Sequence, residues 1–93
     1  MERFPTPFGT TELTDERERH IFKFHPDVRL YRKRFAKTLA KPDIIRRSKH
    51  DSSVLILYQG ISKEKYLAIV TKTNHRNFII TAYLTYKIQH QPS

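Results

Sequence analysis

Apolar positions follow two different periodicities in the two halves of the chain. Up to about residue 40 they recur every three or four residues, which is typical of helices that bury one side. These positions are Ile21, Phe24, Val28, Tyr31, Phe35 and Leu39. From residue 54 onward apolar and polar residues alternate, as half-buried strands require. The order predicts an α+β fold in which two N-terminal helices precede a three- to four-stranded antiparallel sheet and pack on one of its faces.

Capping and turn signals set the expected boundaries. Thr14 is the predicted N-cap of the first helix, since Asp15 and Glu16 suit the positive end of its dipole. Pro26 should bend the chain and open a second helix over residues 27–40. Residues 43–45 are expected to form a short helical turn, residues 1–12 a lead-in or an edge strand, and residues 89–93 a polar tail.

Three strands are expected over residues 54–58, 66–73 and 78–88, and the last two should form a hairpin. If Thr73 and Phe78 flank a four-residue turn, the expected pairs are Val70 with Thr81, Lys72 with Ile79 and Ala68 with Tyr83. Cross-strand partners share a face. One face, here called the polar face, then carries Lys72, Thr81, Tyr83 and Lys87. The core face carries Leu67, Ile69, Thr71, Ile80, Ala82 and Leu84.

Length and composition bound the class of protein. The chain has 93 residues and an apolar fraction of 38%, enough for one modest core, so a single domain over residues 1–93 is expected. Cysteine is absent, which excludes disulfides and thiolate zinc sites. No apolar run approaches the roughly 20 residues of a membrane span, and the N-terminal residues lack the layout of a signal peptide. A soluble cytoplasmic protein without a membrane partner is the expectation.

Positive charge is concentrated in the middle of the chain. The whole chain carries +9, and residues 28–50 alone hold nine bases against one acid, a net of +8. A local block of like charge repels itself, which favours a polyanionic partner such as nucleic acid. The alternative is a solvated helix face that keeps a small protein soluble. The predicted RNA-binding residues are Arg29, Arg32, Lys33, Arg34, Lys37, Lys41 and Arg47.

The polar face combines residue types that suit a phosphodiester. A lysine neutralises charge on phosphoryl oxygens, and the hydroxyls of Thr81 and Tyr83 can donate hydrogen bonds to them. The alternative is that threonine and tyrosine are ordinary strand residues and Lys72 is a surface charge. His20 and His25 are five positions apart, unlike a helical metal pair, and no glycine-rich phosphate loop is present. No metal and no cofactor are therefore expected.

A succession of short motifs resembles a known nuclease superfamily. The chain reads R-x-x-H-I at residues 17–21, H-P-D at 25–27 and T-L-x-x-P-D-x-I at 38–45. It continues with L-Y at 57–58, Y-L-x-x-V-x-K at 66–72 and I-T-A-Y at 80–83. In order and spacing these motifs are similar to the phage-type branch of the barnase, EndoU, colicin and RelE superfamily (BECR), over about residues 13–88. H-P-D stands here where the family has H-P-E.

The resemblance implies helices followed by an antiparallel sheet, and a metal-independent endoribonuclease that serves as the toxin of a toxin–antitoxin or phage-related system. It implies His20, Lys72, Thr81 and Tyr83 as catalytic residues, with His25, Arg46, Tyr58 and Lys87 in support. The expected reaction is attack of a ribose 2′-hydroxyl on the adjacent phosphorus, which gives a 2′,3′-cyclic phosphate and a free 5′-hydroxyl. The expected partners are RNA, such as tRNA or mRNA, and a separate acidic antitoxin or immunity protein.

A second interpretation is a non-catalytic RNA- or DNA-binding module, or a regulator, that uses the basic second helix. One geometric objection applies to the nuclease. If the first helix packs on the core face, His20 is separated from the polar face and takes a structural role instead. The two interpretations differ in one observation, which is whether the pure protein cuts RNA in EDTA.

Overall fold

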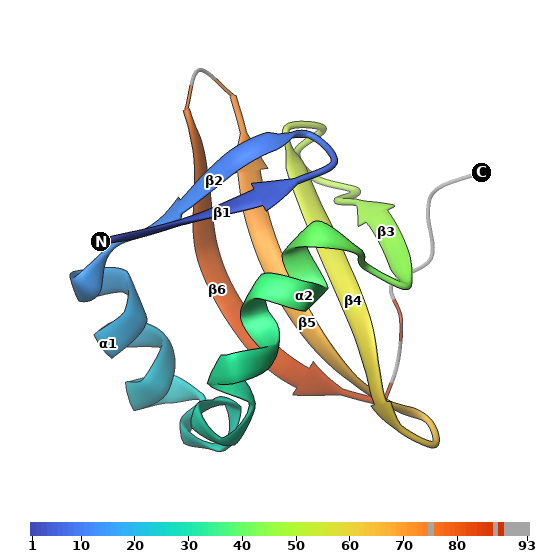
Figure 1. Cartoon of the computed structure of the whole chain (residues 1–93). Coiled ribbons are helices and arrows are strands. Elements are labelled where there is room, and N and C mark those ends of the chain that lie inside the picture. Colours follow the sequence, from blue (N-terminus) through green and yellow to red (C-terminus); the bar gives the residue numbers. More distant parts are fainter. Residues whose placement is uncertain (75, 87, 89–93) are drawn as a thin grey trace.

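The computed structural model describes residues 1–74, 76–86 and 88. It has one six-stranded sheet, in the order β1-β2-β6-β5-β4-β3, and a layer of helices over one of its faces (Figure 1). The strands are β1 (Glu2–Thr6), β2 (Gly9–Leu13), β3 (Ile44–Arg47), β4 (Val54–Ser62), β5 (Lys65–Thr73) and β6 (Asn77–Thr85). The helices are α1 (Asp15–Phe24), the 3-10 helix η1 (Pro26–Arg34) and α2 (Phe35–Ala40). Lys87 and the expected tail at 89–93 lie outside the described residues.

The α+β class is confirmed, but the expected element order is wrong at the N-terminus. β1 and β2 form an antiparallel hairpin ahead of the helices, and β2 joins β6 in parallel at the pair Glu12–Phe78. The sheet is therefore mixed and six-stranded rather than antiparallel with three or four strands. Phe4 and Leu13 are buried and give the hairpin an apolar side. Pro5 is tolerated because β1 lies at the edge of the sheet.

The helices begin where the sequence predicts, but the second one differs in kind. Thr14 caps α1, and its hydroxyl accepts a hydrogen bond from the Arg17 N–H at 3.1 Å. The chain turns at His25, and residues 26–40 then form η1 and α2 instead of one continuous α-helix. Within η1 only Val28 is buried. The basic side chains of η1 would repel one another at α-helical spacing, so few interactions favour an α-helix in this segment. No helix of the described residues is long and apolar enough to cross a membrane.

Two segments that were expected to lie outside the strands belong to the sheet. Residues 43–45 do not form a helical turn, because β3 pairs with β4 from Ile44 onward. The Asp43 carboxylate accepts hydrogen bonds from the Gly60 N–H at 2.8 Å and from Gln59 Nε2 at 2.9 Å, which ties β3 to β4. Residues 59–65 were expected to form a loop between two strands. Most of them belong to β4 and β5, which are joined by a tight turn with Glu64 at a positive φ of 64°. β4 and β5 are therefore longer than predicted.

The two faces of the sheet differ in what covers them. One face carries the main core, in which the helices and the hairpin contribute Phe4, Leu13, Ile21, Val28, Phe35 and Leu39, and the sheet contributes Leu55, Leu57, Leu67, Ile69, Ile79 and Ala82. The opposite face has a smaller cluster of Ile56, Tyr58 and Ala68, with Ile44, Tyr66, Val70, Tyr83 and Ile88 packed around it. The helices thus lie on one face, as expected, and the second face is partly open.

The β5–β6 register agrees with the prediction except near the turn. Ala68 pairs with Tyr83 and Val70 with Thr81, as expected. Thr73 pairs with Asn77, so the turn is shorter than predicted, and a bulge at Ile80 takes up the extra residue. The predicted pair of Lys72 with Ile79 is therefore wrong. Lys72 pairs with Phe78, and Ile79 lies in the main core opposite Thr71.

Candidate active site

Three of the predicted site residues share the open face of the sheet. Thr81 and Tyr83 pair with residues of the smaller cluster, and Lys72 lies two residues beyond Val70 on the same face. All three are half-buried. The structure therefore brings Lys72, Thr81 and Tyr83 to the polar face, on the side of the sheet away from the helices.

Arg46 lies on this face as well, although it comes from the far strand. Arg46 pairs with Ile56, Ile56 with Val70, and Val70 with Thr81, so these residues form one row across four strands. Three strand spacings place Arg46 and Thr81 about 14 Å apart. One Arg46 nitrogen donates to the Ile45 carbonyl at 3.1 Å. The polar face thus has a cation on β3 in addition to the one on β5.

Tyr83 lies at the centre of an aromatic group on the polar face. Burial of its phenol raises the pKa of Tyr83 to about 12, and the neighbouring Tyr58 acts in the same direction. Tyr58 is only 1% exposed and meets the Tyr66 ring edge-on, with 6.3 Å between centroids. Tyr83 therefore stays protonated throughout the neutral pH range and can act as a hydrogen-bond donor.

His25 is the histidine that reaches this group. Its ring lies 6.2 Å from the ring of Tyr83, measured between centroids. The position follows from local structure, because α1 ends at Phe24 and Pro26 starts η1, and His25 between them leaves the helical path. Sequence reasoning gave His25 a supporting role only. An imidazole beside a protonated phenol is suited to proton transfer at the polar face.

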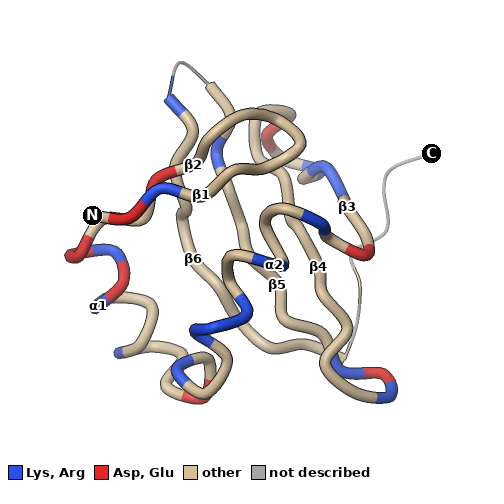
Figure 2. Tube along the Cα trace, viewed as in Figure 1, with Lys and Arg blue, Asp and Glu red and all other residues tan. Residues whose placement is uncertain are grey.

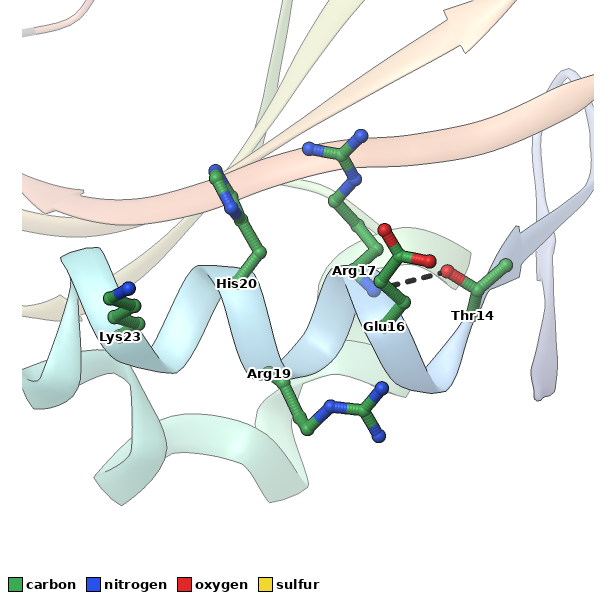
Figure 3. Close-up of a pocket in the computed structure, with 6 residues that line it drawn as sticks. All are labelled: Thr14, Glu16, Arg17, Arg19, His20 and Lys23. Carbon is green, nitrogen blue, oxygen red and sulfur yellow. Dashed lines mark hydrogen bonds between the residues drawn. The ribbon is translucent and has the colours of Figure 1, made fainter.

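His20 occupies a different place. Its side chain is exposed on α1 and contacts the Phe24 ring at a tilt of 50°, with 4.7 Å between ring centroids. Figure 3 shows His20 and Arg17 extending from α1 toward β6, where they line a cleft of about 590 Å³. In the described part of the chain, its ring contact is with Phe24 and not with the polar face. The predicted set of His20 with Lys72, Thr81 and Tyr83 is not brought together.

Lys72 is engaged by a residue that sequence reasoning missed. Its ammonium lies 2.6 Å from the carboxylate of Asp51. The hydrogen bond from Lys72 holds the pKa of Asp51 well below its usual range, and the hydroxyl and N–H of Ser53 lower it further. The signal in the sequence was the run Asp51-Ser-Ser53, in which an aspartate commonly accepts from the residues that follow it.

The predicted RNA-binding residues gather on the other side of the molecule. Figure 2 shows the basic positions running along η1 and α2, the layer that covers the main core, and on into β3. The exposed members are Arg29, Lys33, Arg34, Lys37, Lys41 and Arg47. Arg47 donates a hydrogen bond to the Ser52 carbonyl. The basic helix layer and the polar face therefore lie on opposite sides of the sheet.

Arg32 differs from its basic neighbours because it is built into the fold. Its guanidinium pairs with Glu18 and lies 2.6 Å from the carboxylate of Glu2. It also covers the rings of Phe35 and Phe4, at 5.0 and 5.5 Å from their centroids. These contacts join β1, α1 and η1. Among the predicted RNA-binding residues, Arg32 has ion pairs with two carboxylates, whereas Arg29 contacts the Phe22 ring and Arg47 the Ser52 carbonyl.

Metal sites and relatives complete the picture of the site. Within residues 1–74, 76–86 and 88, no three His, Cys, Asp or Glu side chains gather where they could hold a metal ion. Comparison with known proteins adds no relative from which a role could be transferred: no family model, no curated protein and no solved structure matches the chain.

Proposed function

We propose that the protein is a metal-independent endoribonuclease that acts as a toxin in a toxin–antitoxin or phage-related system. The observation that carries the proposal is the polar face, where Lys72, Thr81 and a protonated Tyr83 share one side of the sheet and the His25 ring lies 6.2 Å from that of Tyr83. The motif resemblance to the phage-type BECR nucleases supports the same reaction class. The basic charge of the chain supports RNA as the substrate.

The reaction uses the RNA as its own nucleophile. His25 accepts the proton of a ribose 2′-hydroxyl while the 2′-oxygen forms a bond to the adjacent phosphorus. Thr81 and Tyr83 donate hydrogen bonds to the phosphoryl oxygens, and Lys72 neutralises their charge after the phosphate replaces Asp51 as its partner. The bond from phosphorus to the 5′-oxygen breaks, and that oxygen takes up the proton that His25 accepted from the 2′-hydroxyl. The products are a 2′,3′-cyclic phosphate and a free 5′-hydroxyl.

This assignment moves the acid–base role from His20 to His25. The reason is position, since His25 contacts Tyr83 and His20 contacts Phe24. Arg46 and Tyr58 keep supporting roles, because Arg46 lies in the row that ends at Thr81 and Tyr58 lies beside the phenol of Tyr83. Lys87 lies outside the described residues, so its supporting role rests on the resemblance alone.

A nuclease directed at cellular tRNA or mRNA needs an inhibitor. We expect a separate acidic antitoxin or immunity protein, because the chain carries +9 and its exposed bases form a layer along η1 and α2. Co-expression should relieve growth arrest caused by the chain alone. Harmless expression of the wild-type chain at high level in several bacterial hosts would contradict the toxin part of the proposal.

The decisive experiment is RNA cleavage in EDTA by the purified chain, with the product ends identified. We expect 2′,3′-cyclic phosphate and 5′-hydroxyl ends. The double variant His25→Gln, Tyr83→Phe, purified identically, controls for contaminating nucleases and should be inactive. Equal cleavage by wild type and double variant, or no cleavage by either, would overturn the catalytic proposal.

A second candidate function is a non-catalytic nucleic-acid-binding module. The observation that favours it is the exposed basic layer on η1 and α2, which lies on the opposite side of the sheet from the polar face. Such a module would bind RNA with a steep dependence on salt and would cut nothing. Reversal of Lys33, Arg34 and Lys37 to glutamate should then abolish all binding.

A further inference from the structure

α1 lies beside the later part of β6 (Figure 1). β2 pairs with β6 at Glu12–Phe78, and beyond this pair α1 lies beside the strand (Figure 1). Two clefts of about 590 and 350 Å³ share Thr14 and Arg17; the larger is lined by α1 and its cap residue, and the smaller also reaches β2 and β6. Their other lining residues are Glu12, Glu16, Arg19, His20, Lys23, Arg76, Phe78 and Ile79. We call this continuous depression the α1–β6 groove.

The groove carries more positive than negative charge, because Arg17, Arg19, Lys23 and Arg76 line it together with the carboxylates of Glu12 and Glu16. Arg17, Arg19 and Lys23 line it, and none of them has an ion pair with a carboxylate of the described residues. Arg17 and His20 extend from α1 toward β6 in Figure 3, and Lys23 follows on the next turn. Arg17 and Lys23, on successive turns of α1 and without a carboxylate partner among the described residues, favour an extended polyanion.

Exposed aromatic rings lie among these cations. Phe78, 39% exposed, lines the groove at one end, and Phe24, 61% exposed, lies at the other. The Phe24 ring lies 4.7 Å from the His20 ring at a tilt of 50°, and the Lys23 ammonium lies 5.7 Å from the Phe24 centroid. Alternation of cations with free aromatic faces is the arrangement that binds single-stranded nucleic acid, since phosphates meet the cations and bases stack on the rings.

The groove ends at the polar face. Phe24 is followed directly by His25, whose ring contacts Tyr83 of β6. An extended strand that follows α1 from Phe78 toward Phe24 therefore arrives at the residues assigned to cleavage. The bases of a duplex are already stacked on one another, so they are not free to stack on these aromatic rings.

We propose that the α1–β6 groove binds the single-stranded RNA substrate on one side of the cleavage site. Arg17 and Lys23 contact its phosphates, and Phe24 and Phe78 stack with its bases. His20 is then a binding residue of the groove and not an acid–base catalyst. The identity of the polymer as RNA rests on the proposed function; the position of the groove rests on the geometry above.

The test uses a probe that cannot be cut. A fluorescent 2′-O-methyl oligoribonucleotide, on the order of ten nucleotides long, has no free 2′-hydroxyl and reports binding by anisotropy. The double variant Arg17→Ala, Lys23→Ala should reduce the slope of log affinity against log salt by about 1.4, or about 0.7 for each lost phosphate contact. Phe24→Ala should weaken binding at least about fivefold. The matched controls are Lys63→Ala in the β4–β5 turn and Leu30→Ala, an apolar side chain that is 82% exposed on η1.

Each outcome decides a different point. Loss of affinity confined to the groove variants, together with weaker binding of the same sequence as a duplex, supports the groove. Equal losses in the Lys63 control, or losses confined to Lys33 and Lys37 variants of the helix layer, overturn it. If the wild-type chain cuts RNA while the groove variants bind the probe normally, the groove is wrong and the proposed function stands. If the groove binds the probe but the chain cuts nothing, the proposed function is wrong and the groove stands.

Discussion

The ammonium of Lys72 lies 2.6 Å from the carboxylate of Asp51, and Ser53 holds that carboxylate with two hydrogen bonds. The cation with the clearest catalytic assignment is thus paired within the protein before any substrate arrives. Asp51 belongs to the segment that joins β3 to β4, so the contact connects this segment to β5. Loss of this ion pair at the polar face is therefore expected to lower the stability of the fold.

This ion pair predicts a loss of stability in acid. The pKa of Asp51 is lowered in the folded protein, so its contribution is present above the ordinary carboxylate pKa of about 4 and is lost as the pH falls below it. The melting temperature of the wild type should therefore fall between pH 5 and pH 2, roughly, by more than that of Asp51→Asn. Thermal denaturation monitored by circular dichroism provides the measurement. Parallel curves for the two proteins would show that the pair contributes nothing to stability.

Substitution of the two histidines should separate their roles. His25→Gln should lower kcat for RNA cleavage on the order of 100-fold or more, the usual scale for a positioned acid–base group. His20→Gln should leave kcat at saturating RNA unchanged and raise KM, because His20 lies in the groove beside Phe24. Single-turnover kinetics distinguish the two effects. The reverse pattern would return the acid–base role to His20.

The donors of the polar face should affect chemistry more than stability. Thr81→Ala and Lys72→Ala are each expected to lower cleavage on the order of 100-fold, the scale of losing one preorganised donor. Thr71→Ala is the matched control, since Thr71 lies in the core and its hydroxyl donates to the Leu55 carbonyl at 3.3 Å. That variant should lose about 1 kcal/mol of stability and keep its activity. Wild-type cleavage by Thr81→Ala with a large loss of stability would reject the polar face as the site.

Arg32 should behave unlike its basic neighbours. Arg32→Ala removes contacts to Glu2, Glu18 and two phenylalanine rings, so we expect a loss of about 1–2 kcal/mol of stability. Lys33→Ala changes an exposed side chain and should stay within about 0.5 kcal/mol of the wild type. Urea denaturation measures both. Equal stabilities would mean that the arginine contacts are offset by the cost of ordering them.

The periodicity of apolar residues predicted most of the helices and strands, because the buried side of each element is visible in its own local sequence pattern. Three features depend on residues that are close in the sequence, and all three were confirmed: the N-cap at Thr14, the break at Pro26 and the β5–β6 hairpin. Residues 1–12 were expected to be a lead-in or an edge strand, and β1 is an edge strand. The pairing of β2 with β6 was not predicted, because it depends on a partner, Phe78, that is distant in sequence. No rule for local segments contains that information.

The candidate site was predicted in part for the same reason. Thr81 and Tyr83 were placed correctly because the register holds up to Val70. The bulge at Ile80 was not predictable, since it depends on Ile79 fitting the core better than the polar face. The contact of His25 with Tyr83 and that of Lys72 with Asp51 join separate elements, and spacing along the chain does not encode them.

The attachment of the N-terminal hairpin to β6 has a consequence for synthesis on the ribosome. A chain emerges N-terminus first, so β1 and β2 wait for β6 before they can join the sheet. The same strand supplies Thr81 and Tyr83. Closure of the sheet and assembly of the polar face therefore happen together, only after β6 has been synthesised. An antitoxin that binds the nascent chain before β6 emerges would meet a protein that has a basic surface but no means of cutting RNA.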